Sequence, residues 1–396
     1  MRQTRQRSAR ERSEEDGGDA TPDAGALIAA SRRVTIKVGS SLLIDSSEKR
    51  VRKAWLASLG DDIAALRGEG KQIVVVSSGA VALGRVHLGL RKSSRLDHKQ
   101  AAAAAGQALL MQAWEEALAP HDIPTAQLLL TIEDSEQRRR WLNARATMEV
   151  LLAQKALPVI NENDSVATDE LKYGDNDRLS ARAAQMIRSD VLILLSDVDG
   201  LYTADPARDP DARHLPYVAE LTGEIEGYAS GPSAAGVGTG GMRTKIAAAR
   251  VASDFGCATV ITSGHEAHPV RRLRQGGKAT IVAGKGSARG AYKQWIAGSL
   301  APAGTVAIDA GAVRALLAGR SLLPAGVRSV TGRFERGACL SVIDDQGREV
   351  ARGLAAYGSR EAQAILGCTS DRIADCLGYE GPHELIHRDD MVMVQT

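Results

Sequence analysis

The segment VTIKVGSSLL at residues 34–43 decides the fold, because a β-branched run leads directly into small turn residues. A helical stretch from Trp55 to Arg67 follows, and then a second run, QIVVVSSGA, at residues 72–80. This order predicts a βαβ unit. The pattern recurs in four later runs, at Thr125 to Leu130, Leu157 to Ile160, Val191 to Leu195 and Thr259 to Thr262. We therefore predict an α/β fold, a three-layer αβα sandwich with a mainly parallel sheet.

Composition narrows the class of protein. The 396 residues are enough for two or three domains at roughly 100 to 200 residues each. Fifty basic and 48 acidic residues give a net charge of +2, which offers no electrostatic argument for a nucleic-acid or membrane partner. No apolar run approaches the roughly 20 residues that a membrane span needs. The four cysteines form no CxxC pair and follow no secretory signal, so we expect reduced thiols in a cytoplasmic protein.

Changes in pattern divide the chain into four parts. Residues 1–31 are mostly charged and small, and their arginines alternate with acids, which favours a disordered extension over a nucleic-acid-binding arm. Residues 32–286 hold the α/β pattern. Residues 287–303 are Gly-rich and read as a linker with a helix or bridge at AYKQWIAG. Residues 304–396 contain short strand candidates between turns and predict a small, compact β-rich domain.

Small and polar residues follow the first two predicted strands, at the edge where ligands collect in parallel sheets. Lys37 ends the first strand and Gly39 opens the turn after it, which suits a phosphate, although a lysine reaching solvent fits equally well. Ser77, Ser78, Gly79 and Ala80 follow the second strand. Free amides there suit a carboxylate or phosphate, and an ordinary Ser-type N-cap is the alternative.

The most polar stretch is NENDSVATDELKYGDND at residues 161–177. It offers amides for a carboxylate, and carboxylates for an ammonium group, for lysines or for magnesium. A solvated loop can also be acidic, but so many amides and carboxylates after a buried strand favour a functional site. The candidates are Asn161, Asp164, Asp175, Asn176 and Asp177.

Two later segments are candidates for nucleotide binding. Ser196 and Asp197 end a fully apolar strand. They fit contacts to the ribose or base of a nucleotide, and they fit a simple turn out of the strand nearly as well. A Gly-rich loop then precedes a helix, and its amides can wrap phosphates while Lys245 offsets developing charge. The loop is not a dinucleotide fingerprint, since no strand precedes it, nor a Walker A loop, since no lysine directly follows its last glycine. Its candidates are Thr239, Gly240, Gly241, Met242, Arg243, Thr244 and Lys245.

A zincin pattern, HExxH, occurs at residues 383–387. It follows Gly381 and Pro382 and closes a β-rich domain, whereas the zinc motif must lie within a helix and find a further ligand. We therefore expect no zinc site there.

Two distant lysines, two Gly/Ser turns and an Asn/Asp cluster together predict in-line phosphoryl transfer to a small anionic acceptor. The segments that carry them resemble, in order, those of the bacterial glutamate 5-kinases of the amino-acid kinase family: IKVGSSLL, VVVSSGAVALG, LPVINENDSVAT, KYGDNDRLSA, LLSDVDGLYTADP and GVGTGGMRTK. The tail segments SLLPAGVRSVTGRFERGACLSV and LGYEGPHELIHRDDM resemble the PUA domain of these enzymes. The resemblance covers everything after about residue 32. It implies transfer of the ATP γ-phosphate to the side-chain carboxylate of L-glutamate, giving L-glutamyl 5-phosphate, the first step of proline biosynthesis.

The resemblance also implies roles for single residues. Lys37 and Lys245 would stabilise the transferring phosphoryl group, and Asp177 would hold both lysines in place. The implied glutamate-binding residues are Ser77, Asp164 and Asn176, with Gly79, Ala80, Asn161 and Asp175. The implied ATP-binding residues are Lys37, Ser196, Asp197 and the loop from Thr239 to Lys245. Magnesium would bridge the ATP phosphates, with no protein ligand named, and a homo-oligomer inhibited by proline at or near the glutamate site is expected. Ser196 departs from the expected threonine but keeps the hydroxyl.

Two alternatives stay open. A sister kinase for aspartate, N-acetylglutamate or a nucleoside monophosphate would share the lysine segments, but it should lack the NEND and GDND pair and the appended domain. RNA binding or modification is a different class, because PUA domains occur in such proteins. The near-neutral charge and the 3% aromatic content argue against it. An RNA gel shift that weakens with salt would discriminate the two classes.

Overall fold

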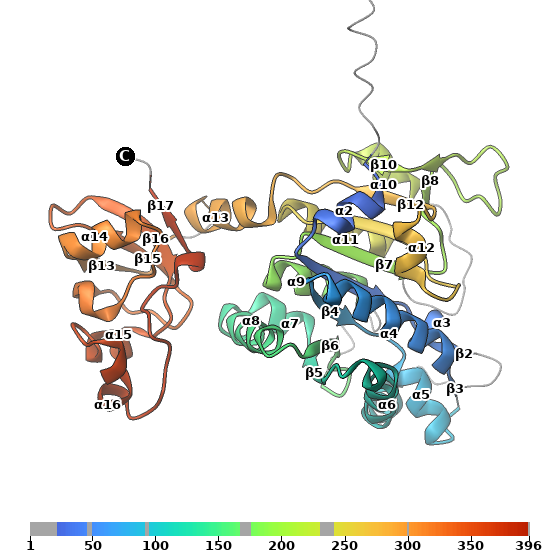
Figure 1. Ribbon diagram of the computed structural model, residues 1–396, viewed down its shortest axis with the longest axis horizontal. Coiled ribbons are helices and arrows are strands. Elements are labelled where there is room, and N and C mark those ends of the chain that lie inside the picture. Colours follow the sequence, from blue (N-terminus) through green and yellow to red (C-terminus); the bar gives the residue numbers. More distant parts are fainter. Residues whose placement is uncertain are drawn as a thin grey trace, which may run out of the picture.

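The structure is a computed structural model that describes residues 22–45, 50–91, 95–166, 176–229, 241–298 and 301–394. Figure 1 shows a larger α/β domain and a smaller β-rich C-terminal domain, with helix α13 (Ala288–Gly298) between them. No helix among the described ranges combines the length and the apolar character needed to cross a membrane.

An eight-stranded sheet forms the centre of the larger domain, in the order β10-β12-β11-β7-β1-β4-β6-β5. Its strands are β1 (Arg33–Val38), β4 (Gln72–Val76), β5 (Thr125–Leu130), β6 (Leu157–Glu162), β7 (Val191–Ser196), β10 (Tyr217–Val218), β11 (Ala258–Ser263) and β12 (Ala279–Val282). All neighbouring pairs are parallel except β11 and β12. β1 lies between β4 and β7, with Lys37 opposite Val76 and Leu194. The predicted, mainly parallel sheet is confirmed.

Helices cover both faces of this sheet. One layer contains α2 (Ala24–Ala30), α4 (Lys53–Gly68), α6 (Leu96–Leu118) and α12 (Pro269–Arg274), and the other contains α8 (Arg138–Ala153), α9 (Asn176–Ile187) and α11 (Met242–Asp254). The two-residue period of β4 serves both layers, because Ile73 and Val75 join the first core while Val74 and Val76 join the second. The predicted αβα sandwich is therefore confirmed.

Short elements complete the larger domain. They are α3 (Ser40–Leu43), β2 (Ile44–Asp45), β3 (Arg50–Val51), α5 (Ala80–His87), α7 (Ile132–Glu136), β8 (Leu201–Tyr202), β9 (His214–Leu215) and α10 (Gly223–Tyr228). β2 pairs with β3 and β8 with β9, each pair antiparallel and outside the large sheet.

Helix α2 lies within the extension that was predicted to be disordered, so that prediction is wrong for residues 24–30. The Asp23 carboxylate caps the helix by accepting from the Ala26 amide at 3.0 Å. Ile28 is fully buried in the core, and the Lys71 ammonium donates to the carbonyl of Ala29 at 2.7 Å. The apolar run LIAA at residues 27–30 is the sequence signal for this helix. The average composition of the whole extension, which is mostly charged and small, concealed that signal. Residues 1–21 lie outside the described part of the chain.

The C-terminal domain is built on a five-stranded sheet in the order β14-β13-β15-β16-β17. Its elements are β13 (Gly304–Ile308), α14 (Ala310–Leu317), β14 (Val327–Thr331), β15 (Cys339–Ile343), β16 (Glu349–Leu354), α15 (Ser359–Ala364), α16 (Ile373–Leu377) and β17 (Met391–Met393). The predicted β-rich domain is confirmed. The HExxH segment at residues 383–387 is not helical, and Ile386 instead bridges to Leu322, so the two histidines share no helix face.

The predicted linker contains α13, which packs as part of the second core. Tyr292 and Ile296 of this helix are buried in one cluster with Trp141 and Met148 of α8. Gly337 of the C-terminal domain also accepts a hydrogen bond from the Arg138 guanidinium. The two domains are therefore joined by packed side chains as well as by the chain.

Charged side chains from both domains meet beside α13. The carboxylate of Asp390 lies 2.5 Å from an Arg145 Nη1 and 2.9 Å from an Arg188 Nη2. The hydroxyl of Tyr292 donates to the same Asp390 oxygen at 3.0 Å, and the Arg188 guanidinium lies 4.1 Å from the centre of the Tyr292 ring. We call these four residues the junction cluster.

Candidate active site

The carboxyl ends of β1, β4, β6 and β7 lie side by side at one edge of the sheet. Backbone hydrogen bonds tie these ends together, from the Ser77 amide to the Ile160 carbonyl at 2.8 Å and from the Gly39 amide to the Leu195 carbonyl at 3.3 Å. In open parallel sheets the strand order changes direction at such a point, and ligands bind there. The strand-end candidates therefore lie at the edge where a site is expected.

Two lysines and one aspartate meet at this edge. The Lys37 Nζ lies 2.5 Å from Asp177 Oδ1, and the Lys245 Nζ lies 3.4 Å from Asp177 Oδ2. The Thr244 hydroxyl donates to the same Oδ2 at 2.7 Å. Lys37 is the last but one residue of β1, Asp177 lies in the first turn of α9, and Lys245 lies in the first turn of α11. These three residues come from segments far apart in sequence, and we call Lys37, Asp177 and Lys245 the lysine cluster.

The lysine cluster is almost completely buried, with Lys37 7%, Lys245 3% and Asp177 1% exposed. Burial alone would raise the pKa of the Asp177 carboxyl, but the charges of Lys37 and Lys245 outweigh it and lower the pKa to about 2. One carboxylate facing two ammonium groups leaves the three side chains with a net charge of +1. Buried charge of this sign favours an anionic ligand.

Two buried asparagines lie next to the lysine cluster. The Asn176 Nδ2 donates to the Ser78 hydroxyl at 2.9 Å and to Asn161 Oδ1 at 3.2 Å. Asn161 Nδ2 and Asn176 Oδ1 are buried and have no hydrogen-bond partner within the described ranges. A buried polar atom without a partner costs about 1–3 kcal/mol. One open donor and one open acceptor therefore point to a ligand that carries both kinds of group.

Asp164 is a buried carboxyl with a different environment. Burial, and then the charge of Glu162, raise the pKa of Asp164 to about 7. A cationic group of a ligand would favour its ionised form. Asp164 is therefore suited to an ammonium group.

The turn after β4 has the shape of an anion site. Gly79 has a φ of 104°, and a side chain there would also meet Ile44 Cγ1 at 3.2 Å, so glycine is required. α5 begins at Ala80 and directs its first amides toward this turn. The Ser77 hydroxyl accepts from the Trp114 indole at 3.0 Å, which fixes its position.

Sequence reasoning missed two supporting residues. Trp114 holds Ser77, and Gln107 donates to the Glu162 carbonyl at 3.3 Å. Trp114 and Gln107 lie in the long Ala-rich helix α6, where no motif marks them. The one available signal was their large or polar side chains among alanines.

The remaining predicted site residues make fewer contacts with the lysine cluster and the asparagine pair. Ser196 and Asp197 form a pair at the end of β7, where the Ser196 hydroxyl donates to Asp197 Oδ1 at 2.9 Å. Gly241 precedes α11, Met242 begins it, and the Arg243 side chain is exposed. Three predicted residues lie outside the described ranges: Asp175, Thr239 and Gly240.

Comparisons with known proteins agree with this architecture. The model of the amino acid kinase family matches residues 32–263, and that of the PUA domain matches residues 304–377. The chain is 58% identical over 367 residues to a glutamate 5-kinase of Caulobacter vibrioides, covering 92% of this chain and 97% of the relative. It is 54% identical to that of Paramagnetospirillum magneticum (92% and 99% covered) and 53% identical to glutamate 5-kinase 1 of Rhizobium meliloti (91% and 92% covered). The chain therefore belongs to the amino acid kinase family, among its glutamate 5-kinases, and carries a PUA domain at its C-terminal end.

Proposed function

We propose that this protein transfers the γ-phosphate of ATP to the side-chain carboxylate of L-glutamate, giving L-glutamyl 5-phosphate, the first step of proline biosynthesis. The observation that carries the proposal is the buried lysine cluster, whose net positive charge lies beside open amide groups at the strand ends. The substrate is inferred from the 58% and 54% identical relatives named glutamate 5-kinase.

The reaction needs positioning and charge stabilisation more than acid–base chemistry. The acceptor carboxylate is already ionised at neutral pH, so one of its oxygens can attack the γ-phosphorus in line while ADP leaves. Lys37 and Lys245 would neutralise negative charge on the transferring phosphoryl oxygens. Asp177 would hold both ammonium groups in position through its two oxygens.

Glutamate would bind in the polar pocket beside the lysine cluster. We place its ammonium group near Asp164 and the open Asn176 Oδ1, and one carboxylate near the open Asn161 Nδ2. The Ser77 hydroxyl and the amides of Gly79 and Ala80 suit the second carboxylate. Asp175 stays a predicted member of this pocket.

ATP would lie across the ends of β7 and α11. Ser196, Asp197 and the residues from Gly241 to Lys245 would contact it, with Thr239 and Gly240 as predicted members of the loop. The described ranges contain no group of three His, Cys, Asp or Glu side chains able to hold a metal, and the lysines occupy Asp177. We therefore propose that magnesium arrives with ATP, bound to its phosphates as part of the substrate.

ATP-dependent hydroxamate formation with L-glutamate, hydroxylamine and magnesium tests this function. We expect product with glutamate and little with aspartate or N-acetylglutamate, and loss of product in folded Lys37→Ala and Lys245→Ala variants. Absence of glutamate-dependent product from folded protein would overturn the proposal, and an RNA gel shift would then test the alternative class.

Three expectations that follow from the resemblance stay predictions. We propose a homo-oligomer, feedback inhibition by proline, and a cytoplasmic location. Light scattering that finds only monomer across working concentrations would remove the first, and activity unchanged by saturating proline would remove the second. Fractionation of cells would test the third.

A further inference from the structure

Two of the four cysteines touch each other in the C-terminal domain. The sulfur atoms of Cys368 and Cys376, eight positions apart in sequence, lie 2.9 Å from one another. The bond in a disulfide is about 2.05 Å long, so a small shift would join them. The sequence gives no CxxC signal here, because a turn of helix separates the two residues.

The backbone on both sides holds the two thiols in contact. Cys376 lies in α16, which Ile373 anchors in the domain core with 2% exposure. Cys368 follows α15, and its amide donates to the Ile365 carbonyl at 3.0 Å. Between them, the Ser370 hydroxyl donates to the His383 carbonyl at 3.2 Å. The contact is therefore a property of the folded domain.

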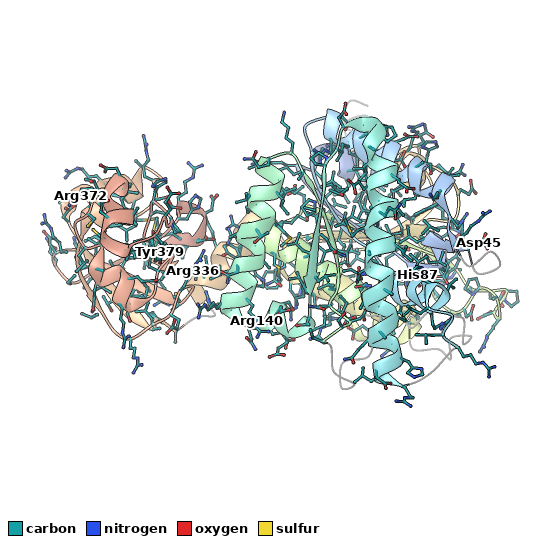
Figure 2. The ribbon with its side chains drawn as sticks, turned by 90° about the horizontal axis from the view of Figure 1, so that it is seen from below. Asp45, His87, Arg140, Arg336, Arg372 and Tyr379 are labelled. Carbon is teal, nitrogen blue, oxygen red and sulfur yellow. The ribbon has the colours of Figure 1, made fainter. Side chains whose placement is uncertain are left out.

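Accessibility separates this pair from the other cysteines. Cys376 is exposed and Cys368 is half-buried, whereas Cys257 and Cys339 are only 1% and 3% exposed. Figure 2 shows Arg372, which lies between the paired cysteines in sequence, at the outer edge of the C-terminal domain, away from the α/β domain. A small oxidant can thus reach this pair without entering the phosphoryl-transfer site.

We propose that Cys368 and Cys376 form a reversible redox site, in which a small disulfide such as oxidised glutathione converts the two thiols into one intramolecular disulfide. Disulfides in cytosolic proteins are usually transient and redox-sensing, which fits an exposed pair of this kind. The site is independent of the proposed kinase reaction.

The chemistry takes two exchange steps. Cys376, the more exposed thiol, loses its proton and attacks one sulfur of oxidised glutathione, forming a mixed disulfide and releasing one reduced glutathione. Cys368 then loses its proton and attacks the Cys376 sulfur, releasing the second. The hydrogen bond to Cys376 raises the pKa of the Cys368 thiol, which suits its role as the second nucleophile. Two thiols and one oxidised glutathione become one disulfide and two reduced glutathiones, and excess reduced glutathione reverses the reaction.

Mass spectrometry of the full-length protein in glutathione buffers of increasing oxidation tests the proposal. Trypsin cleaves after Arg360, Arg372 and Arg388, so each cysteine falls in its own peptide, 361–372 or 373–388. We expect oxidised protein to lose the mass of two hydrogen atoms and to yield these two peptides as one cross-linked species, while Cys257 and Cys339 stay reduced. Dithiothreitol should restore both separate peptides.

Single variants supply the matched control. Cys368→Ser should keep the fold and take up one glutathione at Cys376 that is not released, because the second nucleophile is missing. Wild-type protein that retains glutathione on Cys376 under the same buffer would overturn the proposal. An intermolecular disulfide dimer through Cys376 would also overturn it. A third contrary result would be wild-type thiols that stay reduced in a buffer in which the Cys368→Ser variant is glutathionylated.

Discussion

Asp177 in the lysine cluster and Asp390 in the junction cluster each lie between two cationic side chains. At Asp177 the partners are lysines, and the carboxylate side chain is 2% exposed. At Asp390 they are arginines, both of which lie over the Tyr292 ring, and the carboxylate is 18% exposed. The same arrangement of charge therefore occurs once at the strand ends and once between two domains.

The choice of cation separates the two roles. A lysine ammonium is a compact point charge on a flexible stem, so it can turn from a carboxylate toward a phosphate. An arginine guanidinium is planar, stacks on aromatic rings and donates along several directions, which suits a fixed joint. The lysine cluster is thus suited to exchange partners during a reaction, and the junction cluster to keep them.

The largest expected effect is that of Asp177→Asn, which removes the shared counter-charge from two buried ammonium groups. We expect the free energy of unfolding to fall by about 3–5 kcal/mol. Because the folded-state pKa of Asp177 lies below its ordinary 3.8, this stability is present above about pH 4 and disappears as the pH falls toward 2. Urea unfolding at pH 7 measures the loss. A change below about 1 kcal/mol would show that the carboxylate does not balance the lysines.

Lys37→Met should have the next largest effect, on rate. Loss of one positive charge from the transferring phosphoryl group should lower kcat by about 10²–10³-fold. Arg188→Met removes a cation from the junction cluster and serves as the matched control, with most of the activity retained. Equal losses of kcat in the two variants would erase the proposed difference between the clusters.

Asp390→Asn should affect stability and spare the reaction. The Asp390 carboxylate is more exposed than that of Asp177, 18% against 2%, so we expect the loss of its negative charge to cost about 1–3 kcal/mol in the free energy of unfolding. Urea unfolding combined with the hydroxamate assay separates the two quantities. A loss of kcat similar to that of Lys37→Met would assign a direct role in the reaction to the junction.

Asp164 sharpens the comparison because it is a buried carboxylate with no lysine or arginine among the causes of its raised pKa. With a pKa of about 7, its ionised fraction falls as the pH drops from 8 to 6. If it binds the glutamate ammonium group, KM for glutamate should rise on acidification, approaching about tenfold per pH unit below 7. Asp164→Asn should raise KM and flatten this profile, and a wild-type KM that is constant over this range would contradict the assignment.

The smallest expected effect is that of Arg188→Lys. The charge stays, but stacking on Tyr292 is weakened, so stability should fall by about 0.5–1 kcal/mol. Thermal unfolding of this variant beside Lys37→Arg would compare the two cations directly. An Arg188→Lys variant as stable as the parent would remove the argument for a geometric role of arginine.

Local pattern was enough to predict the sheet and much of the strand-end site. β-branched runs followed by Gly, Ser, Asn or Asp mark where each strand stops, and parallel strands bring those stops to one edge. That rule alone places Lys37 near Ser77. No such rule predicts the junction cluster, since Arg145 and Asp390 are 245 positions apart and neither lies in a motif. Trp114 was hidden for a related reason, because only tertiary packing brings it to Ser77.

Helix α9 begins with Asn176 and Asp177 and is directly followed by Arg188. Its 12 residues span about 18 Å, with Asp177 of the lysine cluster at one end and Arg188 of the junction cluster just beyond the other. Removing the C-terminal domain would take away the Asp390 carboxylate that Arg145 and Arg188 share. The α/β domain on its own would then carry two largely buried cations without that acceptor, so α9 makes the larger domain depend on the smaller one.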